Sequence, residues 1–427
     1  MTDTTQLLEQ EQEIQTVVEE TEKPVKRGAR HAAPKAKKPL WLRIVLGVLS
    51  GIGVVVSLAV AFFLTMFYSP LLPEWRDQYV MMTYQTSNPW LCTLFFSQES
   101  IDAVFDRHTV ATPEGETNPG LIEVPDEPEV KKEFSVSEKY VGETLYDDGE
   151  VQIVKFSGKT TRGKYTARLI QIKDPSRVML GVTNQLGKRG QTIADMAQTN
   201  NALCGINAGG FVDVGGIGNG GTPTELVVKD GVLTIYQEKE TYEIIGFNYD
   251  NVLVLGTYTE EEIPALNLRD AISWGVLRWK PTLILNGTRA QFSGLAGGFD
   301  PRSAIGQRED GLVMLLVVDG SELRGKDGAN MELVTDILWE YGAVNAANLD
   351  GGTSASMALQ GELINTICNP AIASRGRYLA TAWLVKQTDA VLDDTTGTTT
   401  DTMASTTDTT SATTENTTTT QTTTDTQ

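Results

Sequence analysis

Residues 348–357, NLDGGTSASM, place an Asn, an Asp, two glycines and several hydroxyls directly after an apolar stretch. An ordinary turn needs only a glycine and one or two polar residues. Gly351 and Gly352 have no side chains, so a ligand can approach the main chain closely beside Asp350. Asp350 is therefore our first candidate for chemistry, as a nucleophile, a base or a stabiliser of positive charge.

A second carboxyl, Asp319, ends the apolar segment LVMLLVVDG. Between the two acids, the spacing of apolar residues in 329–342 predicts a helix that Gly342 ends. A strand, helix, strand unit normally joins parallel strands, and parallel strands finish at the same edge of a sheet. We therefore expect Asp319 and Asp350 to face one crevice, with simple capping of a turn as the alternative for Asp319.

The surrounding sequence indicates a strand-rich fold. From about residue 146 to 387, apolar runs of strand length alternate with Gly, Asn and Asp turns, and a second helix is predicted over 191–201. With 427 residues, 40% of them hydrophobic, the chain can bury at least one sizeable core. We predict an α+β domain over residues 146–390, with a strand-rich mixed sheet and a few helices.

A charge-free apolar stretch, residues 44–68, precedes this domain and is long enough for a helix to span about 30 Å of hydrocarbon. It follows a long polar arm, which favours an uncleaved signal-anchor over a cleaved signal peptide. Basic residues before it predict a cytoplasmic N-terminus and a domain outside the cell membrane, with lipid as a partner through the anchor. The other predicted segments are a basic arm (1–43), an extracellular stalk, linker or small cap (69–145) and a disordered Thr/Asp-rich tail (391–427).

The charge and the metal-binding residue types exclude several functions. A net charge of -20 argues against nucleic acid as a partner. Three cysteines and two histidines show no zinc-ligand spacing, no organic cofactor is expected, and a divalent cation held by Asp carboxylates and carbonyls is left open. An outside location permits a Cys204–Cys368 disulfide as one pairing, with Cys92 unpaired.

Two motifs fit catalytic patterns only in part. GIGNGG, residues 216–221, matches a dinucleotide-binding loop, but a strand, a turn and a strand follow it instead of a helix, so a flexible rim is the better interpretation. GTSAS, residues 352–356, lacks the last glycine of a nucleophile elbow. His108, the histidine that follows the membrane segment, lies in the linker, so a serine triad is not predicted.

Five blocks in order, GINAGGF, TPTELVVKDG, DPRSAIGQREDGLVMLLVVDG, ELVTDILWEYGAVNAANLDGGTSASM and RYLATAWLV, resemble the phosphodiester glycosidase domain family over about 150–387. The resemblance implies a hydrolase whose substrate is a carbohydrate carrying a glycosyl phosphodiester, such as an N-acetylglucosamine 1-phosphodiester. Bacterial members are often labelled exopolysaccharide biosynthesis proteins, and a membrane anchor before the domain is common among them. The resemblance therefore implies a bacterial cell-surface enzyme.

The resemblance also assigns site residues. The family's glycine-rich, proline-arginine and Asp-Gly-Gly blocks and its late arginine fall on Asn207, Gly209, Gly210, Phe211, Pro301, Arg302, Asp350, Gly351, Gly352 and Arg377, with Arg375 as a near alternative for the last. Val212 stands where relatives tend to have an aromatic residue, and Glu225 where a glycine is frequent, so the pocket differs in shape.

Chemical roles follow from residue type. The planar guanidinium of Arg302 can bind two phosphate oxygens, and Asp350 can manage an oxocarbenium-like sugar carbon, with Asp319 as a partner carboxylate. Asn207 and Asn348 can bond sugar hydroxyls, and Thr353 and Ser354 can donate to phosphate, with bonds inside turns as the alternative for all four.

The hypothesis is an extracytoplasmic glycosidase that cleaves a sugar 1-phosphate diester in cell-surface polysaccharide metabolism, with a transferase at the same bond close behind. Two alternatives from another class are a non-catalytic glycan-binding module and a scaffolding partner of a polymer-export machine. An enzyme would lose turnover on loss of the Asp350 charge, whereas a binding module would not.

Overall fold

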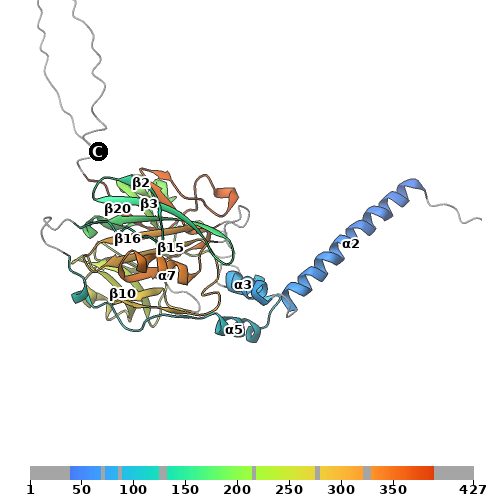
Figure 1. The fold of residues 1–427 in the computed structure, drawn as a ribbon, viewed down its shortest axis with the longest axis horizontal. Helices are drawn as coiled ribbons and strands as arrows, with labels where there is room; N and C mark the ends of the chain where they lie inside the picture. The colour runs from blue at the N-terminus through green and yellow to red at the C-terminus, as the bar shows by residue number, and fades with distance from the viewer. Residues whose placement is uncertain are drawn as a thin grey trace, which may run out of the picture. The chain divides into compact units, whose positions relative to one another are not determined.

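The computed structural model describes residues 39–68, 73–84, 89–124, 132–213, 218–274, 279–320 and 328–388 (Figure 1). The chain divides into two compact units, Met1–Pro73 and Glu74–Gln427. The predicted basic arm up to residue 38, the Thr/Asp-rich tail, and Gly216 and Ile217 of the predicted rim lie outside the described residues.

In the described part of the first unit lies a long helix, α2 (Leu40–Tyr68). By length and composition, its segment Leu40–Thr65 can cross a membrane. The apolar run carries no charged residue after Arg43, and the β-branched valines within it are tolerated in an apolar helix. The predicted long apolar helix is confirmed and begins four residues before the expected Ile44.

The second unit is built on antiparallel sheets, and every strand pair that the structure describes is antiparallel. The largest sheet has the order β13 (Thr288–Arg289), β12 (Thr282–Leu285), β17 (Ala343–Asn348), β15 (Arg302–Arg308), β16 (Val313–Asp319), β4 (Lys164–Ile172), β3 (Val151–Lys159) and β2 (Gly142–Asp147). The strand-rich α+β class predicted from the sequence is confirmed, with antiparallel pairing in place of a mixed sheet.

Two five-stranded sheets and a short pair complete the strands. One has the order β10 (Leu253–Tyr258), β9 (Tyr242–Asn248), β11 (Leu268–Ser273), β7 (Leu226–Lys229) and β8 (Val232–Ile235). The other has the order β19 (Glu362–Leu363), β18 (Met357–Leu359), β6 (Ala202–Asn207), β20 (Thr381–Lys386) and β5 (Val178–Val182). The short pair joins β1 (Val110–Ala111) and β14 (Gln291–Phe292). The hairpin β7–β8 follows the rejected glycine motif, as the sequence predicted.

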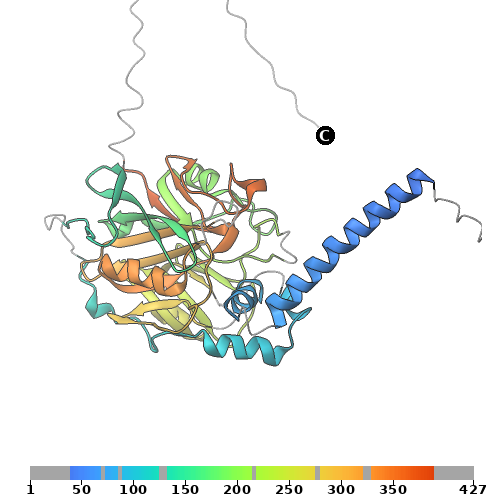
Figure 2. The same ribbon diagram turned by 45° about the vertical axis from the view of Figure 1, so that its right-hand side comes forward.

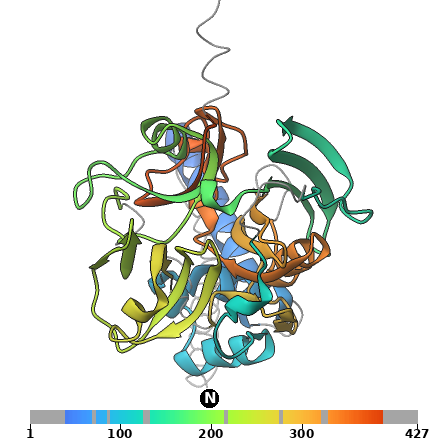
Figure 3. The same cartoon turned by 90° about the vertical axis from the view of Figure 1, so that its left-hand side faces the viewer.

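One core joins the three large sheets, which surround a common interior in Figure 3. It contains Ile170, Leu315 and Ile305 from the eight-stranded sheet, with Phe247 and Trp383 from the two five-stranded sheets. The Phe247 and Trp383 rings meet edge to face at 5.6 Å, a favourable aromatic geometry. Strands buried on both faces explain why segments such as LVMLLVV are continuously apolar.

Helix α7 (Met331–Glu340) connects β16 to β17 on the outside of the sheet (Figures 1 and 3). The Asn330 side chain caps its start by accepting from the Leu333 backbone N–H at 3.0 Å, and Gly342 at φ +91° follows its end. The two connected strands run in the same direction, as expected. They are not neighbours, however, because β15 forms a hairpin with β16 and pairs with β17 on its other edge.

The remaining helices are short. They are α3 (Pro73–Tyr84), α4 (Trp90–Thr93), α5 (Gln98–Arg107), α6 (Ile193–Thr199) and the 3-10 turns η1 (Pro119–Leu121), η2 (Pro175–Arg177), η4 (Ile263–Leu266), η6 (Gly352–Ser354) and η7 (Pro370–Ile372). Helix α6 confirms the helix predicted over 191–201, and α4 shows that WLCTLFF begins as a helix. In Figures 1 and 2, α3 and α5 lie beside the strand-rich domain, although the sequence placed them in a linker.

The disulfide between Cys204 and Cys368, which the sequence left open as one pairing, is not formed, and all three cysteines are free. Cys204 is fully buried inside β6 within the central core, whereas Cys368 lies in the loop before η7. Burial raises the pKa of the Cys368 thiol to about 11. The possible pairing is not realised, because Cys204 is enclosed in the core and Cys368 lies in a loop outside it.

We predict that Leu315→Ala, in the centre of β16, lowers the free energy of unfolding by about 2–5 kcal/mol, because it opens a cavity in a fully buried strand. Val232→Ala, at an exposed side chain of β8, should change it by less than about 0.5 kcal/mol. Urea unfolding followed by tryptophan fluorescence measures both. Equal effects of the two substitutions would contradict the assignment of the core.

Candidate active site

The loop after β17 holds Asp350 by main-chain hydrogen bonds to two other segments. The Asp350 backbone N–H donates to the Ala208 carbonyl at 3.1 Å, and the Gly352 N–H donates to the Pro301 carbonyl at 2.9 Å. Gly352 has φ +58°, in the left-handed region that favours glycine, and a Cβ on Gly351 would lie 2.7 Å from the Pro301 oxygen. The glycine pair is therefore needed for the loop to pass close to the start of β15.

The side chain of Asn207, at the end of β6, connects the same segments from beneath. Its Nδ2 donates to the Asp350 carbonyl at 2.6 Å, and its Oδ1 accepts from the Ser303 hydroxyl at 2.7 Å and the Ser356 N–H at 3.1 Å. Asn207 is fully buried and does not line the cavity described next. The structure thus places it as a support of the Asp350 loop, not in the sugar contact that its residue type suggested.

A cavity of about 290 Å³ opens above this loop, near the lower size limit of small-molecule sites, about 300 Å³. Most residues proposed from the sequence line it: Gly210, Arg302, Asn348, Asp350, Gly351, Gly352, Thr353, Ser354 and Arg377. The other lining residues are Met82, Phe211, Asp213, Thr224, Trp274, Asp300, Met331 and Leu349. The segments that carry them are far apart in the sequence, and the fold brings them to one place.

Asp319 does not line this cavity, so the expectation that it faces the same crevice as Asp350 is wrong. Its carboxylate is fully buried and accepts from Arg168 Nη1 at 2.7 Å, Asn365 Nδ2 at 3.0 Å and the Thr366 N–H at 3.2 Å. The cause is topological. Because β15 separates β16 from β17, the two acids are not on neighbouring strands, and Arg168 on the other neighbour, β4, binds Asp319.

Asp350 has an unusual electrostatic environment. Burial raises the pKa of its carboxyl from 3.8 to about 6, and the negative charge of Asp213 adds to this, against the opposing effects of Ser354 and Arg377. A carboxyl with a pKa near 6 exchanges protons in the range in which most enzymes operate. Near neutral pH the Asp350 carboxyl can therefore exchange between its protonated and ionised forms.

Arg302 is buried, and backbone carbonyls hold most of its guanidinium. Its Nε donates to the Ala329 carbonyl at 3.2 Å, and its Nη2 donates to the carbonyls of Gly297 and Gly298, both at 2.9 Å. Asp300 lies 3.7 Å from Nη2. Within the described residues Nη1 has no hydrogen-bond partner, so one side of the fork is available to a ligand in the cavity.

Arg377 is the second cation of the cavity. It forms an ion pair with Asp213, its Nη1 donates to the Thr353 hydroxyl at 3.2 Å, and its guanidinium lies 4.6 Å from the centre of the Phe211 ring. Arg375 instead stacks on Tyr378 at 4.6 Å and does not line the cavity. The geometry thus favours Arg377 over Arg375 as the counterpart of the family's late arginine.

Sequence reasoning missed the aromatic wall of the site. A Cβ on Gly210 would lie 1.9 Å from the Trp274 ring, so Gly210 is needed for this indole to pack on the main chain. The family resemblance indicated Gly210, but no sequence pattern indicated Trp274, which follows β11 in a segment without a recognisable motif. Of the two departures from the family, Glu225 is buried in bonds to Lys239 and Ser273, away from the cavity, and Val212 is exposed.

Two further expectations from the sequence concern Gly209 as a binding residue and a divalent cation held by carboxylates. A Cβ on Gly209 would lie 3.1 Å from the Ile272 side chain, so this glycine packs against β11 and not along the cavity. Among the described residues, no group of three or more His, Cys, Asp or Glu side chains is arranged to hold a metal ion.

Comparisons with known proteins relate part of the chain to one family. Residues 200–386 match the family model for phosphodiester glycosidase. The chain is 29% identical over 236 residues to the SPbeta prophage-derived uncharacterized protein YomE of Bacillus subtilis, covering 51% of this chain and 34% of that protein. It is 28% identical over 231 residues to the mouse N-acetylglucosamine-1-phosphodiester alpha-N-acetylglucosaminidase, covering 49% and 42%.

Among solved structures, the catalytic domain of the zebrafish N-acetylglucosamine-1-phosphodiester alpha-N-acetylglucosaminidase, auto-inhibited by its pro-peptide, gives a TM-score of 0.45 at 21% identity, over 59% of this chain and 89% of that one. The matches to the curated relatives cover less than half of their length. The sequence matches relate residues 200–386 of this chain to the phosphodiester glycosidase family.

The raised pKa of Asp350 predicts a stability effect. Because the folded-state pKa, about 6, exceeds the usual 3.8, the folded chain binds this proton more tightly than the unfolded chain. Stability is therefore present at low pH and lost as the pH rises through about 4 to 6, by at most about 3 kcal/mol.

Asp350→Asn removes this titration. The variant should gain stability over the wild type as the pH rises from 4 to 7.5, measured by urea unfolding at several pH values. A difference between variant and wild type that does not change with pH would contradict the raised pKa.

Proposed function

We propose that this chain is a membrane-anchored, extracytoplasmic glycosidase that cleaves a sugar 1-phosphate diester, of the N-acetylglucosamine 1-phosphodiester kind, in cell-surface polysaccharide metabolism. The observation that carries the proposal is the presence, in one cavity, of a carboxyl with a raised pKa and two arginines. The family domain and the substrate named for the mouse relative support the substrate class.

The phosphodiester is proposed to bind through the two arginines. Arg302 offers its Nη1, while its other nitrogens are fixed by backbone carbonyls, so the guanidinium is oriented before a ligand arrives. Arg377 is oriented in the same way by Asp213 and Thr353. Charge-assisted hydrogen bonds from such groups are stronger than neutral ones, so they can hold the phosphate as it leaves.

Asp350 is proposed to act at the anomeric carbon. Cleavage of the bond between this carbon and the phosphate oxygen leaves positive charge on the sugar, which an ionised carboxylate stabilises or attacks. Phosphate is a good leaving group and needs little help from an acid. The proposed role of Asp350 is therefore that of the ionised nucleophile, base or stabiliser, with its proton released before substrate binds.

The walls of the cavity suit a sugar ring. Phe211 and Trp274 are among the lining residues, and aromatic side chains of this kind can pack against a sugar ring. The Oδ1 of Asn348 is buried without a hydrogen-bond partner in the described part of the chain, so it can accept from a sugar hydroxyl. Helix α2 is proposed as the uncleaved anchor, with the basic residues before it in the cytoplasm and the domain outside.

We predict that Asp350→Asn lowers kcat by about 100-fold to 10,000-fold on a chromogenic N-acetylglucosamine phosphodiester, with KM changed little, because the charge acts mainly in the transition state. Asp250→Asn, the same change at an exposed position, is the control and should have full activity. The assay uses the full chain with and without chelator, and intact cells given external substrate test the location.

Binding of the sugar phosphate without turnover, by the wild type and by the Asp350→Asn variant alike, would contradict the enzyme and favour a glycan-binding module. Release of the sugar onto an added acceptor in place of water would assign a transferase.

The pH dependence of kcat/KM gives a second test. If ionised Asp350 carries the reaction, kcat/KM should fall about tenfold per pH unit below an apparent pKa near 6, since protonation removes the active form. Steady-state rates between pH 4.5 and 8.5 measure this. A rate that instead rises as the pH falls through 6 would assign Asp350 as a proton donor.

A further inference from the structure

Helix α3 contributes to the cavity from outside the family domain. Its Met82 is one of the lining residues, and the other lining residues in the described part of the chain lie between 210 and 377. Residues of α3 and α5 face inward: Val80, Met81, Ile101 and Val104 are buried. Helix α3 therefore contributes to the site, and both helices pack inward and are more than a spacer to the membrane segment.

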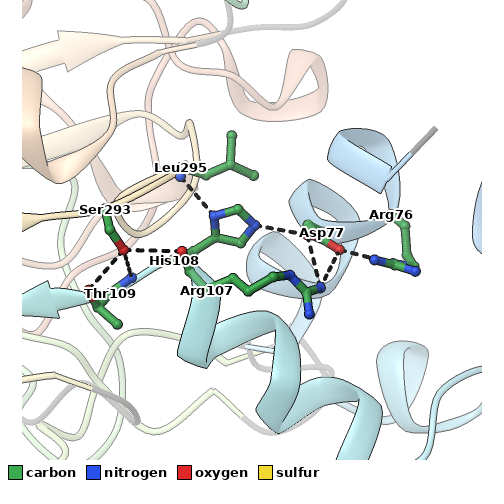
Figure 4. A network of polar contacts seen from close by, with 7 residues as sticks. All are labelled: Arg76, Asp77, Arg107, His108, Thr109, Ser293 and Leu295. Atoms are coloured by element: carbon green, nitrogen blue, oxygen red, sulfur yellow. Dashed lines mark hydrogen bonds and ion pairs between the residues drawn. The ribbon is translucent and has the colours of Figure 1, made fainter. Parts of the chain in front are cut away.

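A buried carboxylate, Asp77, joins the two helices (Figure 4). It accepts from Arg76 Nε at 2.9 Å, Arg107 Nη2 at 3.1 Å and His108 Nε2 at 2.9 Å, with only 5% of its side chain exposed. Burial alone would raise its pKa, but the bonds from His108, Arg76 and Arg107 outweigh this and lower the pKa to about 2. Asp77 is therefore an ionised anchor point at all working pH values.

His108 extends this network to the segment 293–299 (Figure 4). Its Nδ1 accepts from the Leu295 backbone N–H at 3.0 Å, so its ring proton lies on Nε2 and points to Asp77. Gln78, next to Asp77, donates to the Phe299 carbonyl at 3.3 Å. The helices thus hold the segment near both of its ends.

The segment between these two contacts is the one that fixes Arg302. The carbonyls of Gly297 and Gly298 accept from Arg302 Nη2. Ala296, Gly297 and Gly298 have φ values of +44°, +86° and +76°, a run of left-handed residues that is unfavourable for Ala296. Such a conformation persists only where its surroundings hold it, and His108 and Gln78 supply part of that hold.

We propose that Asp77, Gln78 and His108 are positioning residues for the site: through residues 293–299 they set the place of Arg302 and so the affinity for the phosphate of the substrate. The inference rests on the proposed function for the identity of the ligand. It assigns a functional role to a region that the sequence indicated as a stalk, linker or small cap, and it makes the membrane-proximal helices part of the binding unit.

The test compares His108→Ala, which removes both imidazole bonds, with His108→Gln, whose amide can accept from Leu295 and donate to Asp77. Asp106→Ala, at an exposed position at the end of α5, is the matched control. On the full chain in detergent, three quantities are measured: amide hydrogen exchange of 293–299, exchange of β16 as a folding control, and the Kd of N-acetylglucosamine 1-phosphate by calorimetry.

We expect His108→Ala to exchange faster at 293–299 and to bind the sugar phosphate about tenfold more weakly, with β16 unchanged. His108→Gln should restore most of the affinity, and Asp106→Ala should match the wild type. If β16 also exchanges faster in His108→Ala, Gln78→Ala, which removes the single bond to Phe299, takes its place with the same expected results.

Faster exchange with unchanged affinity would overturn the proposal, since the helices would then hold the segment without affecting the site. Unchanged exchange, or tighter binding, would overturn it as well, the latter because the helices would obstruct the cavity. A wild type that binds no sugar phosphate would instead refute the proposed function, and the exchange data would still decide whether the helices hold the segment.

Discussion

The amide of one asparagine, Asn207, sets the position of the candidate catalytic acid. One fully buried side chain donates to the carbonyl of Asp350 and accepts from Ser303 and Ser356. The bonds join the ends of two sheets to the loop that carries the acid. A buried amide with unmet hydrogen bonds costs more than the bonds contribute when formed, so this connection strongly favours a single arrangement. The cavity above depends on that arrangement.

The cost of the site is electrostatic. Asp350 is held where its charge is poorly solvated and near Asp213, and the rise in its pKa expresses that cost. The two arginines are held in fixed orientations. Backbone carbonyls hold Arg302, and an ion pair with Asp213 holds Arg377. Groups fixed in this way lose little entropy on binding a phosphate, which is how a small cavity can select a charged substrate. Residues 296–298, which supply carbonyls to Arg302, have positive φ values, a conformation that is unfavourable for Ala296.

Sequence reasoning predicted the local features best. Local sequence patterns found α6, α7 and the long apolar helix α2, because each depends on the nearest few residues. It also marked Gly351 and Gly352 as positions that need no side chain, but it expected a ligand beside them, whereas the structure places the Pro301 carbonyl 2.7 Å from where a Cβ on Gly351 would lie.

The features that sequence reasoning predicted wrongly or missed depend on the pairing of segments that are distant in the chain. In the main sheet β15 lies between β16 and β17, so Asp319 is separated from Asp350. The Asp319 carboxylate instead accepts a hydrogen bond from Arg168. Asp213 and Trp274 reach the cavity from loops after other strands, and no local pattern marks them. The contribution of Met82 to the cavity could not be predicted from the family resemblance either, because α3 lies outside the matching region.

The central claim is that one cavity brings a sugar phosphate to Asp350, and a crystal structure of the Asp350→Asn variant with N-acetylglucosamine 1-phosphate tests it most directly. We predict the phosphate in contact with Arg302 Nη1 and Arg377, with the anomeric carbon facing residue 350. A sugar phosphate bound elsewhere, or bound here with its anomeric carbon turned away from residue 350, would contradict the claim.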